Sequence, residues 1–258
     1  MMDAELLEAY ADRSRALDLS GIDWSAVARH RIPDEALRTL RYMQDIETHT
    51  IVYLRELLAT RAIDEPGVGD FLACWIFEES AHGRALRRFL EETGQVVEPR
   101  MRSRANVSQR LQEGLIARLS RFWPDFVGVH MTWGAINERT TLAGYKRLAV
   151  LADHPVLSDL LGRIARDESR HFAFYFHHAR RWLERPRVAG VVRFLIERFW
   201  GPVGTGVQPT AETRFLGRYL FSGADGRAAV RGVDRTIQSL PGLAGLPLLE
   251  SWLEHAGI

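Results

Sequence analysis

The chain has 258 residues, and its 34 lysine and arginine residues against 33 aspartate and glutamate residues give a formal net charge of +1. This balance argues against a dedicated nucleic-acid-binding protein, which usually carries a clear basic excess. The single cysteine, Cys74, excludes an internal disulfide and a cysteine-rich zinc site. Because there is no apolar run of about 18 residues and no signal-peptide pattern, we expect no membrane span and a cytoplasmic location.

Hydrophobic residues recur with helical spacing along almost the whole chain, which predicts an all-α fold. Proline and glycine mark most of the expected helix ends. Pro33 and Pro186 suit a first helical turn, and Gly94 suits a C-terminal cap. The expected helices span residues 3–18, 33–62, 68–93, a stretch from about 108 to 152 that Pro124 interrupts, 156–184 and 186–200, followed by two or three shorter ones.

Four of these helices are about 25–30 residues long, and they form two pairs that are each joined by a short turn. Short connections make antiparallel neighbours, and the longer segment 95–123 can cross from one pair to the other. We therefore predict a four-helix bundle with one long crossover and additional peripheral helices. We expect a single domain over 1–258, with the core bundle at about 33–184 and C-terminal helices over 185–258.

Each of the four long helices carries one glutamate inside its apolar stripe, at positions Glu47, Glu79, Glu138 and Glu168. Such a stripe faces the core, and a carboxylate buried there must be protonated, paired or bound to a metal. Glu79 is followed three residues later by His82, and Glu168 by His171. Residues i and i+3 share one face of a helix, so each pair can reach one ion.

Four carboxylates and two imidazoles suit two octahedral ions of intermediate hardness, such as Fe(II) or Mn(II). Two glutamates with two Glu-x-x-His pairs form the ligand set of ferritin-like di-iron and di-manganese proteins. We predict a ferritin-like bundle that binds two iron ions, with manganese possible at one position. The predicted ligands are Glu47, Glu79, His82, Glu138, Glu168 and His171. The alternative is a set of buried Glu–Arg or Glu–His pairs without metal.

Three segments resemble the most diagnostic parts of soluble acyl-carrier-protein desaturases: FEESAHGRAL (77–86), INERTTLAGY (136–145) and ARDESRHFAFYF (165–176). QDIETHT (44–50) is a looser match to the first ligand helix of this family, and the resemblance covers roughly 35–200. It implies a non-haem di-iron centre in a homodimer. The implied activity is the O₂-dependent insertion of a cis double bond into an acyl chain on acyl carrier protein, with electrons from ferredoxin.

Carried over residue by residue, the resemblance implies the same six metal ligands, with Glu79 and Glu138 as the bridging carboxylates. Thr141 matches a family threonine near the oxygen site, and Asp167 matches a carboxylate that would orient His82. The chain is shorter than the plant members, and Thr48 and His49 follow Glu47 where the family often has acidic residues. The substrate cavity and the surface for the carrier protein can therefore differ.

The ligands alone leave other functions open. One alternative is another ferritin-like di-iron oxygenase, a hydroxylase or N-oxygenase, acting on a small or carrier-tethered substrate. The other is a non-catalytic metal-binding or metal-free paralogue. Arginine clusters at 84–88, 100–104 and 180–187 are either solvated helix faces or a docking surface for acidic acyl carrier protein.

Several residues near the motifs have plainer expected roles. We expect Glu78 at the surface or behind the ligands, and His49, His177 and His178 in solvated or interface positions. The aromatic residues of the ligand helices are expected mainly to fill the core, and they are Trp75, Trp133, Tyr145, Phe172 and Tyr175.

Overall fold

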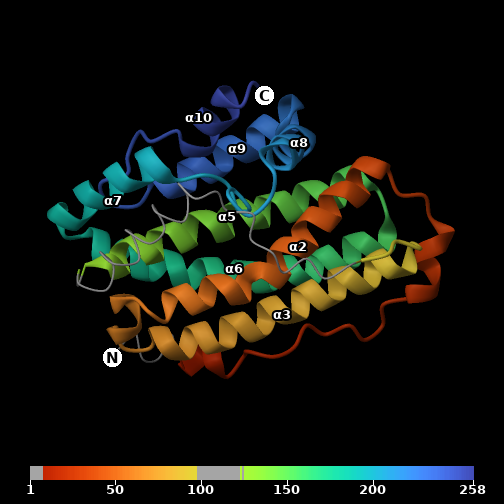
Figure 1. Ribbon diagram of the computed structural model, residues 1–258, viewed down its shortest axis with the longest axis horizontal. Helices are drawn as coiled ribbons and strands as arrows, with labels where there is room; N and C mark the ends of the chain where they lie inside the picture. The colour runs from red at the N-terminus through yellow and green to blue at the C-terminus, as the bar shows by residue number, and fades with distance from the viewer. Residues whose placement is uncertain (1–7, 98–122, 124) are drawn as a thin grey trace.

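The computed structural model describes residues 8–97, 123 and 125–258, and this part of the chain contains helices with a single isolated bridge, between Thr205 and Gln208. Four long helices form a bundle (Figure 1). They are α2 (Asp34–Leu57), α3 (Val68–Glu92), α5 (Phe126–Ala152) and α6 (Pro155–Leu183). The predicted all-α, ferritin-like class is confirmed.

The two most closely packed helix pairs are α5 with α6 and α2 with α3. Within each pair the helices run antiparallel (Figure 1). Helix α3 ends at the opposite end of the bundle from the start of α5 (Figure 1). Most of the predicted crossover segment, 95–123, lies outside the described residues. The helix expected from about residue 108 and its interruption at Pro124 lie outside the described residues.

The helix ends follow the local signals where these are strong. Gly94 has a φ of 79°, and the Gln95 N–H donates to the Leu90 carbonyl at 3.0 Å, which closes α3 with a glycine cap. At the start of α6, His154 Nδ1 accepts a hydrogen bond from the Leu157 N–H at 3.3 Å, and Pro155 occupies the first turn.

Two expected boundaries are wrong. The helix expected over 3–18 is helical, within the described residues, only over 8–11, and residues 14–19 have no regular structure. The backbone N–H of Arg15 donates instead to Glu78 at 3.4 Å, which is a tertiary contact that periodicity does not show. Helix α2 ends at Leu57 rather than near 62, because the Thr60 hydroxyl accepts from the Ala62 N–H at 3.2 Å and caps the short helix η2 (Arg61–Asp64).

The shorter helices α7 (Pro186–Phe199), α8 (Thr210–Phe221), α9 (Gly223–Gln238) and α10 (Leu248–His255) lie over α5 (Figure 1). Helices α7, α8 and α9 contact α5 directly, and α8 also contacts α2. Buried apolar residues from Tyr10 to Leu253 belong to one core. The division of the chain into a single domain stays a prediction. Among the described helices, none is long and apolar enough to cross a membrane.

Helix α5 approaches α6 closely because residue 134 is glycine. A Cβ atom built on Gly134 would lie 2.4 Å from Cδ1 of the buried Tyr175 ring. Real Cβ atoms do not approach other atoms this closely, so any larger residue would force the two helices apart.

We expect Gly134→Ala to lower the free energy of unfolding by about 1–3 kcal/mol through overpacking. Gly162→Ala is the matched control, because this helical glycine has no heavy atom within 4 Å of an added Cβ. Alanine has the higher helix propensity, so the control should gain about 0.5–1 kcal/mol. Thermal unfolding of the two variants measures the difference, and a Gly134→Ala protein as stable as the control would contradict the packing argument.

Candidate metal centre

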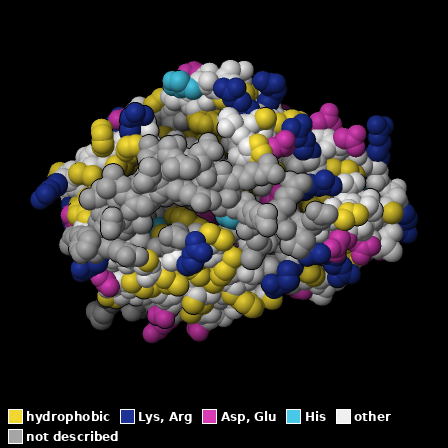
Figure 2. All heavy atoms as spheres, viewed as in Figure 1, with side chains coloured by type: hydrophobic (Ala, Val, Ile, Leu, Met, Phe, Trp, Pro, Cys, Tyr) yellow, Lys and Arg dark blue, Asp and Glu magenta, His cyan; other side chains and the backbone are white. Residues whose placement is uncertain are grey.

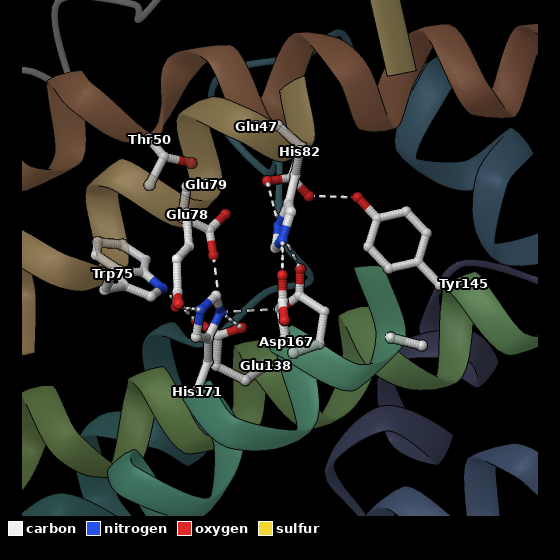
Figure 3. Close-up of polar contacts among 12 residues, drawn as sticks. Glu47, Thr50, Trp75, Glu78, Glu79, His82, Glu138, Tyr145, Asp167 and His171 are labelled. Atoms are coloured by element: carbon white, nitrogen blue, oxygen red, sulfur yellow. Dashed lines mark hydrogen bonds and ion pairs between the residues drawn. The ribbon is translucent and has the colours of Figure 1, made fainter. Parts of the chain in front are cut away.

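All six predicted ligands lie inside the bundle, and none is more than 7% exposed. Helix α2 carries Glu47 and α5 carries Glu138. Helix α3 carries Glu79 with His82, and α6 carries Glu168 with His171. Figure 3 shows the labelled side chains pointing toward one another between the helices.

The donors form two groups of four, and in each group one ligand atom per residue lies within 4.8 Å of the others. The first group is Glu47, Glu79, His82 and Glu168, and the second is Glu79, Glu138, Glu168 and His171. The carboxylates common to both groups are therefore Glu79 and Glu168. A pair of metal ions placed in the two groups would be bridged by these residues.

This grouping favours Glu168, in place of the expected Glu138, as the carboxylate shared with Glu79. Glu168 faces both histidines, with Oε1 3.3 Å from His82 Nδ1 and Oε2 3.4 Å from His171 Nδ1. Of the two histidines, Glu138 approaches His171 alone, with Oε2 3.9 Å from Nδ1. Glu47 is its counterpart at the other end, with Oε2 3.9 Å from His82 Nδ1.

Six buried atoms that face the middle of this cluster have no hydrogen bond of good geometry within the described residues, although some of them lie 3.0–3.4 Å apart as Glu–His pairs. They are Glu47 Oε2, Glu79 Oε1, His82 Nδ1, Glu168 Oε1, Glu168 Oε2 and His171 Nδ1. Buried polar atoms are almost always hydrogen-bonded, so a group of six such atoms needs a specific explanation. All six are carboxylate oxygens or imidazole nitrogens, which suits iron or manganese. The residues therefore fit a pair of divalent cations.

The electrostatics of the cluster support the same reading. Burial, reinforced by the neighbouring charges of Glu79 and Glu168, raises the pKa values of Glu47 and Glu138 well above the ordinary value. Burial alone would lower the pKa of His82, but the carboxylates of Asp167 and Glu168 outweigh it and raise this pKa to about 9. Two divalent cations would balance the charge of the four carboxylates.

Each histidine is held from behind by a carboxylate of the opposite helix pair. His82 Nε2 lies 3.1 Å from Asp167 Oδ2, and His171 Nε2 lies 2.8 Å from Glu78 Oε2. Arg170 joins the two carboxylates, with its Nη1 and Nη2 atoms each 2.7 Å from one of them. Such contacts fix the imidazole with its other nitrogen, Nδ1, toward the carboxylates, where it would be available to a bound metal.

Asp167 thus lies where the resemblance implied, beside His82. Glu78 is fully buried, so of its two expected positions it takes the one behind the ligands. Burial would raise the pKa of Glu78, but hydrogen bonds from His171 and Tyr10 and the charge of Arg170 lower it to about 2. The sequence held a signal for this residue, because an acidic residue precedes both Glu79 and Glu168.

Two aromatic residues expected to fill the core hold the outer carboxylates. The Tyr145 hydroxyl donates to Glu47 Oε1, and Trp75 Nε1 donates to Glu138 Oε1 at 3.1 Å. Periodicity could not reveal either contact, because an aromatic residue in a helical stripe has the same pattern whether or not its polar atom has a partner.

The histidines outside the cluster lie in different environments. His49 is half-buried and lines the cavity beside the cluster. The solvated or interface position expected for His178 is wrong, because this residue is 2% exposed within the chain and packs against the Phe174 ring at 4.3 Å. Residue 178 lies two helical turns after His171, on the same inward face. Burial lowers the pKa of His178 to about 4, so the ring is neutral near pH 7.

A cavity of about 340 Å³ adjoins the cluster and includes Glu47, Glu79, Glu138 and Glu168 in its wall. Thr140 and Thr141 both line it. The Thr140 hydroxyl donates to the Ile136 carbonyl at 2.8 Å, whereas the Thr141 hydroxyl makes no hydrogen bond within the described residues. The threonine that bonds back to its own helix is therefore Thr140, and the Thr141 hydroxyl stays available to the cavity.

The two groups of ligands predict how many metal ions each ligand variant retains. Glu47→Ala removes a ligand of one group only and should leave about one metal ion per chain, whereas Glu168→Ala affects both groups and should lose both ions. Metal content after anaerobic loading with Fe(II) measures this, with circular dichroism as the folding check. Glu91→Ala is the control variant, because Glu91 is an exposed residue that forms an ion pair with Arg87. Two ions retained by Glu168→Ala would refute the shared role of Glu168.

The chain is similar to known proteins. A family model described as "Fatty acid desaturase" matches residues 6–194. The protein "putative acyl-ACP desaturase DesA2" of Mycobacterium tuberculosis, in strains H37Rv and CDC 1551 / Oshkosh, is 29% identical over 157 residues. That alignment covers 61% of this chain and 54% of DesA2, so the match spans about half the length of this relative.

The X-ray structure of DesA2 from strain H37Rv superposes with a TM-score of 0.54 at 20% identity, over 96% of this chain and 89% of that one. The two proteins therefore share a fold. The family model extends across all four bundle helices and includes the six predicted ligands. Since it covers well over half of the sequence, the chain belongs to the fatty acid desaturase family, of the acyl-carrier-protein desaturase type.

Proposed function

We propose that the chain is an O₂-dependent di-iron oxidoreductase that desaturates an acyl chain carried on acyl carrier protein. The observation that carries the proposal is the pair of buried ligand groups that share Glu79 and Glu168 and open onto a cavity. When bound, two iron ions would supply the O₂ chemistry that removes hydrogen from an unactivated C–H bond.

The chain's own residues prepare the site for that chemistry. Asp167 and Glu78 hold His82 and His171 with Nδ1 toward the cluster. Tyr145 and Trp75 fix the carboxylates of Glu47 and Glu138, which would otherwise rotate in the cavity wall. Held side chains need little rearrangement during a reaction, and this preorganisation is how a protein scaffold contributes to the rate.

The cavity suits an acyl chain. Apart from the carboxylates, much of its wall is apolar, and the C-terminal helices complete it with Leu216 and Leu220 of α8 and Leu249 and Trp252 of α10. Such walls bind methylene groups and exclude water. Thr141 lies one helical turn after Glu138, and its Oγ1 atom can hold or deliver a proton where the cavity meets the ligands.

The proposal includes three partners implied by the family. Acyl carrier protein would dock on exposed arginines such as Arg84, Arg87 and Arg180, while the cluster at 100–104 lies outside the described residues. A ferredoxin-type protein would supply electrons. A homodimer would cover apolar surface, since Ile51 and Phe77 are about half exposed and Figure 2 shows hydrophobic side chains gathered over α2 and α3.

The test is turnover of acyl carrier protein loaded with a saturated acyl chain, by iron-loaded protein supplied with reduced ferredoxin and O₂. We expect a product that has lost two hydrogens, with none formed without O₂. A product that has gained one oxygen atom would instead support the hydroxylase alternative. Higher salt should weaken carrier binding because it screens the arginine contacts, and equal turnover of a free fatty acid would argue against the carrier.

Thr141→Val keeps the side-chain shape and removes the hydroxyl. We expect this variant to keep its metal but to lose at least about tenfold in product formed per O₂ consumed. Thr140→Val is the comparison, because it removes a hydroxyl already bonded to its own helix, and its effect should be smaller. If Thr141→Val forms as much product per O₂ consumed as the unaltered protein, then Thr141 has only a structural role.

A further inference from the structure

The two histidines of the cluster are held from behind in similar ways but with unequal firmness. Behind His82, the carboxylate of Asp167 lies 3.1 Å from the ring nitrogen Nε2 and 2.7 Å from Arg170 Nη1. The side chain of Asp167 is 12% exposed. Glu78, behind His171, is fully buried and receives the ring at 2.8 Å and Arg170 at 2.7 Å. Two further groups, both from the N-terminal segment, donate hydrogen bonds to Glu78 rather than to Asp167.

These two groups are the Tyr10 hydroxyl, 2.7 Å from Glu78 Oε2, and the backbone N–H of Arg15, 3.4 Å from Oε1. The Tyr10 ring is 6% exposed and lies 5.0 Å from the Phe71 ring and 5.9 Å from the Phe174 ring. Aromatic packing therefore places the hydroxyl. Burial raises the pKa of Tyr10 far above its ordinary range, so the hydroxyl is always available as a donor.

We propose that Tyr10 is a positioning residue that acts through Glu78, and that it makes the group of Glu79, Glu138, Glu168 and His171 the tighter of the two metal sites. The inference rests on the proposed di-iron function and adds to it. It makes the two sites inequivalent, so that the first metal ion binds on the His171 side. It also gives the N-terminal segment a role in metal binding.

Two effects of the Tyr10 hydrogen bond oppose each other. The hydroxyl donates to the same oxygen as His171, so it lowers the negative charge that polarises the ring. It also fixes the carboxylate, and hence the direction of the ring. Loss of an outer partner of a metal-bound histidine typically costs about 10–100-fold in metal affinity, so the orienting effect should be the larger.

The experiment is a Co(II) titration of metal-free protein, followed by calorimetry and visible absorption, which requires no turnover. His82→Ala leaves the His171 group as the complete site, and His171→Ala leaves the His82 group. We expect Tyr10→Phe to weaken Co(II) binding by about tenfold in the His82→Ala background and by less than twofold in the His171→Ala background. Asp167→Asn is the mirror variant and should show the opposite pattern.

Phenylalanine preserves the packing of the ring, and thermal unfolding checks that each variant folds. If Tyr10→Phe does not fold, Glu78→Gln removes the charge at the same carboxylate and should weaken binding on the His171 side alone. Equal losses in both backgrounds, or none in either, would overturn the role of Tyr10 while leaving the metal centre in place. Failure of the unaltered protein to bind Co(II) would overturn the proposed function, and this inference with it.

Discussion

Four carboxylates buried at the centre of one bundle are the constraint on which the rest of the structure depends. Burial, together with their mutual repulsion, raises the pKa values of Glu47 and Glu138, and a buried charge without compensation is costly. Among the described residues, His82 and His171 supply part of the compensation, whereas Arg170 pairs with Glu78 and Asp167 behind them. A site of this kind makes chemical sense when divalent cations complete it.

The same contacts tie the two halves of the bundle together. His82 of the α2–α3 pair is held by Asp167 of the α5–α6 pair, and His171 of the second pair is held by Glu78 of the first. Arg170 bonds to both carboxylates and so spans the two connections. Each half therefore orients the histidines of the other, and a shift of one helix pair against the other would disturb both groups of donor atoms at once.

Sequence predicted what depends on local periodicity, and it missed what depends on how helices cross. The inward direction of Glu79 and His82 follows from i, i+3 spacing on one helix. The shared role of Glu168 does not, because it arises from where α6 passes both histidines. The same limit explains the missed contacts of Trp75 and Tyr145, whose partners lie on other helices. A helix was expected over 3–18, where tertiary contacts with Glu78 decide the conformation of the chain.

Some residues of the cavity wall lie within the segment that the family model matches, and others come after it. All six ligands fall within residues 6–194, whereas Leu216, Leu220, Leu249 and Trp252 come after them. Asp234 of α9 accepts hydrogen bonds from the Leu249 and Glu250 N–H groups at 2.9 and 3.1 Å, which anchors the start of α10 at the cavity wall. In the proposed function, metal chemistry and substrate fit therefore rest on separate segments, so the C-terminal helices can change the shape of the bound chain while the ligands stay in place.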